Sequence, residues 1–164
     1  MASLYKKTIN GNPGGVYSCA IQGNPPLSHS DAEIFVPPYL QQLDIVRPSI
    51  VSDIQTVAYG QPVSVYVAAG DEPNPTELID FATLIRCDSV THHFGWDQRC
   101  IRLEITSINA QTREITFAGL PPNDATNRGH FLAPPGYYML FIVRKPTGSP
   151  LVRVPSVARF VQVL

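Results

Sequence analysis

Short segments in which apolar and polar residues alternate recur along the chain. The clearest is Pro62–Ala69, in which Val63, Val65 and Val67 are separated by serine and tyrosine. A period of two is the signature of a β-strand with one buried face. Similar patterns predict strands over further segments, which are Val16–Ile21, Glu33–Val36, Ile45–Val51, Phe81–Cys87, Arg99–Thr106, Arg113–Ala118, Gly136–Arg144 and Ser156–Leu164.

Two of these segments depart from simple alternation. Ile45–Val51 contains Pro48, which has no amide proton for an inner ladder, so it is predicted to be an edge strand. Tyr137–Val143 is almost continuously apolar, which predicts a central strand buried on both faces.

The turns between the strands decide the fold class. Sixteen prolines and 11 glycines in 164 residues oppose long helices. Apart from Val16–Ile21, seven or eight short strands separated by turn residues predict an all-β fold, an antiparallel two-sheet β-sandwich. Residues 1–30 contain two Gly/Pro/Asn clusters and are predicted to form an irregular N-terminal arm, with the sandwich over residues 31–164.

Charge and composition limit the partners. Twelve Lys and Arg balance 13 Asp and Glu, for a net charge of −1, whereas a nucleic-acid-binding surface needs a basic excess. No apolar run reaches the roughly 18 residues of a membrane span, and no secretory signal is evident, so synthesis in the cytosol is expected. Charged residues make up only 15% of the chain, against about 25% in typical domains. This predicts a surface partly covered by other protein subunits.

The three cysteines, Cys19, Cys87 and Cys100, show no metal-binding spacing. We expect three reduced and buried thiols. Cys87 and Cys100 flank one loop on two predicted strands and could face each other, so their bonding state stays open.

Two stretches go beyond a general β-pattern. Ser89–Arg99 contains Thr-His followed by Asp-Gln-Arg, and Leu132–Phe141 contains Ala-Pro-Pro-Gly-Tyr-Tyr-Met-Leu-Phe. Together they resemble the C-terminal immunoglobulin-like early-set (E-set) domain of the galactose oxidase and glyoxal oxidase family, the copper radical oxidases. Arg47-Pro48 and Pro155–Ala158 fit in the same order, and the resemblance covers about residues 28–164.

The resemblance carries over one copper-binding residue. In that family two histidines and two tyrosines hold the copper, and all but one of these ligands lie on a propeller that precedes the domain. His92, in the Thr-His motif, is the one matching position, although Phe94-Gly95-Trp96 follows where the family typically has Asn. We expect the residues before the domain to be too few for a propeller. This chain is therefore expected to be no enzyme and to hold no cofactor, with copper bound only in an oxidase that includes the propeller.

The other motif residues are predicted to stabilise the fold. Asp97 and Arg99 are expected to brace the loop, with Arg99 pairing to a carboxylate or to backbone carbonyls at the start of a strand. Pro135, Gly136 and Tyr137 form a rigid turn into the next strand, where a tyrosine hydroxyl bonds back to the backbone. Metal binding by His92 together with His29 or His130 is the weaker alternative, because most metal sites need three or four ligands.

Three functions stay open. The leading one is a structural module that docks through its N-terminal arm onto a homo-oligomer or larger shell, such as a virus capsid that it decorates. Its interaction residues would be Tyr5 and Tyr17 in the arm and Phe94 and Trp96 in the loop. The second is a domain of a secreted copper radical oxidase that supplies His92 as one ligand. The third is carbohydrate or partner binding through Trp96 and Phe94.

Overall fold

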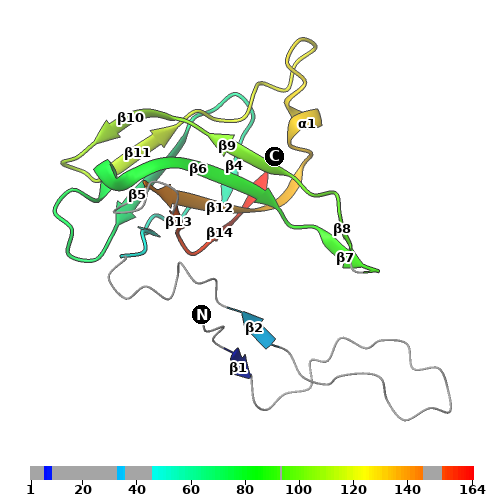
Figure 1. The fold of residues 1–164 in the computed structure, drawn as a ribbon. Helices are drawn as coiled ribbons and strands as arrows, with labels where there is room; N and C mark the ends of the chain where they lie inside the picture. The colour runs from blue at the N-terminus through cyan, green and yellow to red at the C-terminus, as the bar shows by residue number, and fades with distance from the viewer. Residues whose placement is uncertain (1–5, 9–32, 36–45, 93, 146–152) are drawn as a thin grey trace. The chain divides into compact units, whose positions relative to one another are not determined.

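The structure, a computed structural model, describes residues 6–8, 33–35, 46–92, 94–145 and 153–164. The chain divides into two compact units, residues 1–45 and 46–164 (Figure 1). In the first unit, β1 (Lys6–Thr8) pairs antiparallel with β2 (Glu33–Phe35), which falls within a predicted strand. The predicted strand Val16–Ile21 lies outside the described residues, as do Tyr5, Tyr17 and Cys19.

The second unit is built from two sheets (Figure 1). The four-stranded sheet has the order β10 (Ile105–Asn109), β11 (Glu114–Phe117), β5 (Val63–Ala68) and β3 (Ser49–Ile50). The six-stranded sheet has the order β4 (Thr56–Val57), β14 (Arg159–Val163), β12 (Gly136–Arg144), β6 (Ile79–Arg86) and β9 (Cys100–Leu103), with β13 (Val154–Pro155) also paired to β12. These sheets confirm the all-β, immunoglobulin-like class. They contain more strands than predicted because the two-residue segments β4 and β13 also pair and because one predicted strand divides into β9 and β10.

The core lies between the two sheets. On β5 the predicted alternation is observed, since Val63, Val65 and Val67 are buried and the residues between them are exposed. Ile115 and Phe117 of the neighbouring β11 are also buried in the same cluster. Burying each such side chain stabilises the fold by about 1.5–3 kcal/mol, so this one face of the four-stranded sheet contributes substantially to folding.

The predicted edge strand is confirmed, because β3 forms the end of the four-stranded sheet. The predicted strand Arg99–Thr106 is wrong as a single element. It divides into β9 and β10, which belong to different sheets, and the chain crosses between them at Glu104. Alternation alone does not reveal a crossing, since the apolar residues on both sides of it face the same core.

The central position of β12 is confirmed, but its burial on both faces is wrong. Tyr138, Leu140 and Ile142 are buried in the core, whereas Tyr137 is 62% exposed and Met139 is only partly buried. The reason is that the described residues of this unit form two layers, so the outer face of the six-stranded sheet has no third layer over most of its area.

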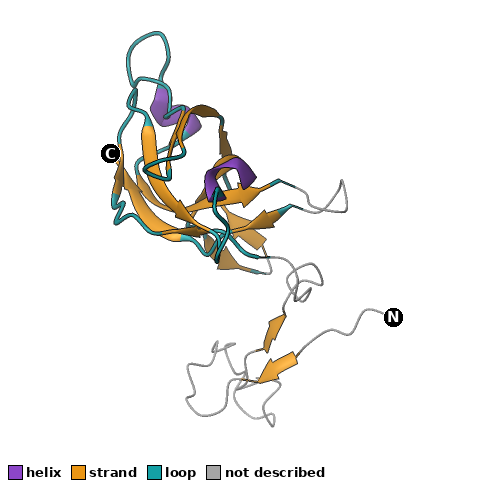
Figure 2. Ribbon diagram, turned by 90° about the vertical axis from the view of Figure 1, so that its left-hand side faces the viewer, coloured by secondary structure: helices purple, strands orange, loops and turns teal. Residues whose placement is uncertain are grey.

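Helices are short, as the proline content predicts. In the part of the chain that the structure describes, they are a 3₁₀ turn, η2 (Pro75–Leu78), and α1 (Gly129–Leu132), both shown in purple in Figure 2. Among the described residues, no helix is both long enough and apolar enough to cross a membrane.

Candidate functional site at one end of the sandwich

A hairpin extends from the six-stranded sheet between β6 and β9 (Figure 1). Its strands are β7 (Ser89–Thr91) and β8 (Phe94–Trp96), paired so that Val90 lies opposite Gly95. A Cβ atom on Gly95 would overlap the carboxylate of Asp88 and the amide of Gln98. Glycine at this position therefore lets the base of the hairpin close.

His92 lies at the turn of this hairpin. Its side chain is exposed, and its φ of 53° places it in the left-handed region, which non-glycine residues seldom adopt. His92 therefore lies at the tip of the hairpin, the part most distant in sequence from β6 and β9.

Within the described part of the chain, His92 and His130 do not come together in a metal site. Among the described residues, no three His, Cys, Asp or Glu side chains are grouped so that they could hold a metal ion. The Nδ1 atom of His130 is hydrogen-bonded to Asn123, and its ring lies 4.2 Å from that of Phe131. His29 lies outside the described residues.

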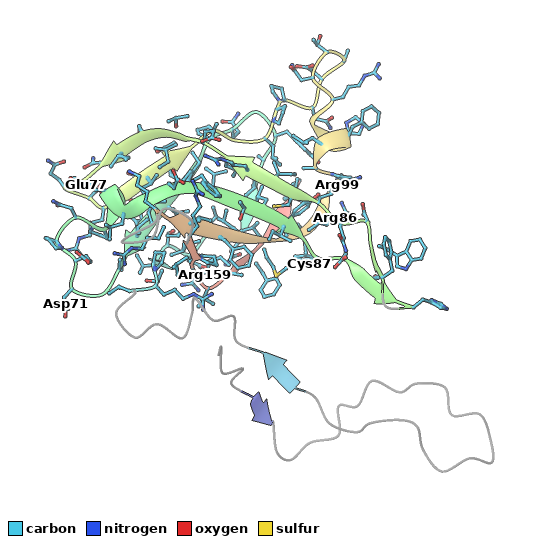
Figure 3. All side chains as sticks on the ribbon, in the orientation of Figure 1. Asp71, Glu77, Arg86, Cys87, Arg99 and Arg159 are labelled. Carbon is cyan, nitrogen blue, oxygen red and sulfur yellow. The ribbon has the colours of Figure 1, made fainter. Side chains whose placement is uncertain are left out.

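At the base of the hairpin, Asp97 joins Arg86, the last residue of β6, and Arg99, the residue before β9. Its carboxylate lies 2.8 Å from Nε of Arg86 and 3.4 Å from Nη2 of Arg99. Asp97 also has left-handed backbone, with φ 61°. The sequence left a carboxylate or backbone carbonyls as partners of Arg99, and the observed partner is the Asp97 carboxylate. The pair is part of a three-residue cluster whose arginines are labelled in Figure 3.

Arg86 is the residue that sequence reasoning missed. Its Nη1 donates to the Pro134 carbonyl at 3.0 Å and to the Tyr138 hydroxyl at 3.2 Å. Arg86 ends an apolar strand, Phe81–Arg86, and a charge in that place was the available signal. Because Asp97 and Pro134 are far apart in sequence, the pattern could not show that Arg86 connects them.

The tyrosine whose hydroxyl bonds back to the backbone, which the sequence left open, is Tyr138. The Tyr138 hydroxyl donates to the Pro134 carbonyl at 2.8 Å and its side chain is fully buried, whereas Tyr137 points to the exposed outer face. Pro135 is exposed. Gly136 has a φ of 144°, a positive value that favours glycine at this position. Nearby, the Tyr59 hydroxyl donates to the Ala133 carbonyl at 2.5 Å, and burial raises the pKa of Tyr59.

The prediction of buried thiols is wrong for Cys87 and Cys100, which are both exposed and free. Cys100 lies opposite Ile85 in the β6–β9 ladder, so it does not face Cys87 directly. Alternation along each strand places both thiols on the outer face, which no third layer covers.

Exposed apolar side chains gather at the same end of the sandwich. Phe94 and Trp96 are 58% and 55% exposed, and their rings pack edge to face with centroids 5.4 Å apart. β12 begins at this end and is preceded by α1, and its first residue pairs with Val163 near the C-terminus. We call the exposed apolar residues of these segments the hairpin-end surface: Phe94, Trp96, Phe131, Leu132, Tyr137 and Leu164.

The sequence and this fold agree with one known domain class. Residues 47–163 match the galactose oxidase-like early-set domain. The chain is 31% identical to the aldehyde oxidase GLOX of Vitis pseudoreticulata over 80% of its own length and 23% of that protein's. It is 30% identical to a galactose oxidase of Gibberella zeae over 96% of its length and 19% of that protein's. The aldehyde oxidase GLOX1 of Arabidopsis thaliana is 29% identical over 80% of this chain and 20% of its own length.

Because the match to the domain covers most of the chain, the chain belongs to the galactose oxidase-like early-set domain family. It spans about a fifth of the length of the curated relatives that it matches. The matched region in those oxidases is thus a small part of a larger protein.

Proposed function

We propose that this chain is a non-enzymatic, immunoglobulin-like module that docks onto a larger protein body through the hairpin-end surface. The proposed partner is the catalytic body of an oxidase of this family. The observation that carries the proposal is that six large, exposed apolar residues lie on segments that meet at one end of the sandwich. Exposed apolar surface concentrated in one region characteristically marks a protein interaction site.

The position of His92 supports the same partner. The resemblance identifies His92 as the residue that reaches a copper site from this domain, and it lies at the exposed turn of the hairpin that carries Phe94 and Trp96. The described residues do not fit a copper site of their own, since no three ligand side chains are grouped. The described residues fit a role in which His92 contributes one imidazole to a copper site whose other ligands lie on the partner.

The other predicted functions have less support. The relatives are named as oxidases, and neither they nor the described residues favour docking through Tyr5 and Tyr17 or decoration of a virus capsid. Carbohydrate binding would use Phe94 and Trp96 as a stacking platform. We favour a protein partner because α1 and β12 extend the apolar surface beyond that aromatic pair.

The proposal can be tested with the galactose oxidase of Gibberella zeae from which the region matching this chain is deleted. Sedimentation velocity of that protein mixed with this chain is expected to show a one-to-one complex. The double variant Phe94→Ala/Trp96→Ala should bind at least 10-fold more weakly, because it removes the central aromatic contacts. Ile108→Ala is the matched control, since Ile108 is a similarly exposed apolar residue on β10 of the other sheet.

Two results would count against docking at this surface: no complex with the intact chain, or equal weakening by the control variant. His92→Ala separates docking from ligand supply. It is expected to leave the complex intact and to abolish any oxidase activity that the added chain restores. Loss of glycan binding by Trp96→Ala, without formation of a complex, would favour the carbohydrate alternative.

A further inference from the structure

The outer face of the six-stranded sheet carries an apolar patch along its central strand. Tyr137, Met139 and Phe141 of β12 alternate with residues of the core and therefore lie on the outer face. The strand register places Met139 between Phe160 of β14 and Ile85 of β6. We call these five residues the outer-face patch: Ile85, Tyr137, Met139, Phe141 and Phe160.

This patch is only partly covered by its neighbours. Phe160 and Tyr137 are 66% and 62% exposed, whereas Ile85, Met139 and Phe141 are half-buried. An aromatic side chain presents about 200 Å² when it is fully exposed, so the five residues together expose roughly 400 Å² of mostly apolar surface. A contiguous apolar surface of this size characteristically marks an interaction site.

No charged side chain interrupts the patch. Arg102, the outward residue of β9 on the same face, has its charge paired with Glu104 at 2.6 Å. A partner of this patch is therefore selected by shape and apolar area, and not by charge. The residues directly opposite the patch residues on neighbouring strands are also uncharged: Thr83, Cys100 and Gln162.

These properties favour a second copy of the same chain as the partner. The net charge of −1 leaves little long-range repulsion between two copies. Two identical, uncharged sheet faces can meet across a two-fold axis, at the spacing of about 10 Å at which sheets pack face to face. Homodimer interfaces are also more apolar than other interfaces, and charged residues are depleted at their centre.

We infer that two copies of this chain associate through the outer-face patch, with their six-stranded sheets packed face to face. Two patches and their polar margins bury about 1,000 Å² in total, which is the lower limit for a specific interface. The dimer is therefore weak, with a dissociation constant of about 10–100 μM. The inference does not rest on the proposed docking, since only Tyr137 belongs to both surfaces.

Sedimentation velocity of the full chain over a concentration series tests the inference. The weight-average mass is expected to rise from 18.0 kDa toward twice that value. Phe160→Glu should raise the dissociation constant of the dimer at least 10-fold, because its carboxylate would lose water in an apolar interface. Ile108→Glu is the matched control and should leave the constant unchanged, since Ile108 is an exposed residue of β10 in the other sheet.

NMR of the unaltered chain locates the interface without relying on a variant. With isoleucine and methionine methyl groups labelled, the signals of Ile85 and Met139 should shift as the chain is diluted through the dissociation constant. The methyl signal of Ile108 should stay fixed over the same dilution, because β10 belongs to the four-stranded sheet.

Several results would overturn the inference. One is a mass that stays at 18.0 kDa up to a concentration of about 1 mM. Another is a dimer that Phe160→Glu leaves intact or that Ile108→Glu weakens equally. Loss of the dimer in Phe94→Ala/Trp96→Ala, without shifts at Ile85 and Met139, would assign the contact to the hairpin-end surface. Shifts that occur only after addition of the truncated Gibberella zeae oxidase would assign the patch to that partner and not to a second copy.

Discussion

At the scale of single residues, the site depends on a small polar network at the entry to β12. The Tyr138 hydroxyl and the Arg86 guanidinium both donate to the Pro134 carbonyl, and Arg86 also holds Asp97 across the base of the hairpin. One carbonyl thus connects the turn before β12 to the loop that carries the hairpin. This network positions the hairpin relative to the rest of the site.

Tyr138→Phe is predicted to lower the free energy of unfolding by about 1–2 kcal/mol, because it removes a buried hydroxyl that makes two hydrogen bonds. Tyr137→Phe is the matched control on the adjacent, exposed side chain, and it should change stability by less than about 0.5 kcal/mol. Urea denaturation of both variants measures the difference. Equal stabilities would show that the network contributes nothing.

Asp124 gives a prediction about pH. Hydrogen bonds from the Asn127 backbone and side chain and from the Thr126 backbone lower the pKa of Asp124 below 3.8. Since the folded state holds this carboxylate ionised, its stabilising effect is present above pH 3.8 and is lost as the pH falls through the lowered value. NMR titration of the Asp124 carboxyl should show this lowered pKa, and amide exchange at Asn127 should quicken as Asp124 becomes protonated. A pKa at or above 3.8 would contradict it.

At the scale of elements, two glycines should respond differently to the same change. A Cβ atom on Gly119 would overlap the backbone carbonyl of Gln61, whereas on Gly95 it would meet only the ends of the Asp88 and Gln98 side chains. Gly119→Ala is therefore predicted to cost about 3 kcal/mol, because backbone must move. Gly95→Ala should cost less than about 1 kcal/mol, since side chains can rotate. Thermal unfolding of both variants tests the order, and a larger loss for Gly95→Ala would contradict it.

Alternation predicted the strands well where one face is buried. The bounds of β12 match the prediction, and β5 and β11 fall within predicted segments, because core packing requires a period of two there. It failed at Glu104, where the chain passes from one sheet to the other, and at the outer face of β12, where the apolar residues remain partly exposed. Both failures concern what lies opposite a strand, which a local pattern does not encode.

The candidate site was predictable only in part. The Thr-His and Asp-Gln-Arg motifs predicted His92, Asp97 and Arg99 as site residues. Phe94 and Trp96, the aromatic residues between these motifs, were predicted as interaction residues. The role of Arg86 and the contact between its guanidinium and the Tyr138 hydroxyl depend on residues that are brought together only by the β6–β9 and β6–β12 pairing. Tertiary contacts of this kind have no periodic signal.

At the scale of the whole molecule, residues 46–164 form a core of their own. The described core cluster contains only residues of this unit, from Ile50 to Val163. A chain that begins at Val46 is therefore predicted to fold, with a melting temperature within a few degrees of that of the full chain. Circular dichroism and a dispersed amide NMR spectrum would check this. An unfolded product would show that residues 1–45 are required for folding.

The central claim is that the hairpin end is the face by which this early-set module meets its partner. Hydrogen–deuterium exchange, with and without the truncated Gibberella zeae oxidase, tests it most directly. Residues 89–96 and 131–137 should become protected in the mixture, whereas β10 and β11 at the far sheet should exchange as before. Protection confined to β10 and β11, or none at the hairpin, would contradict the account.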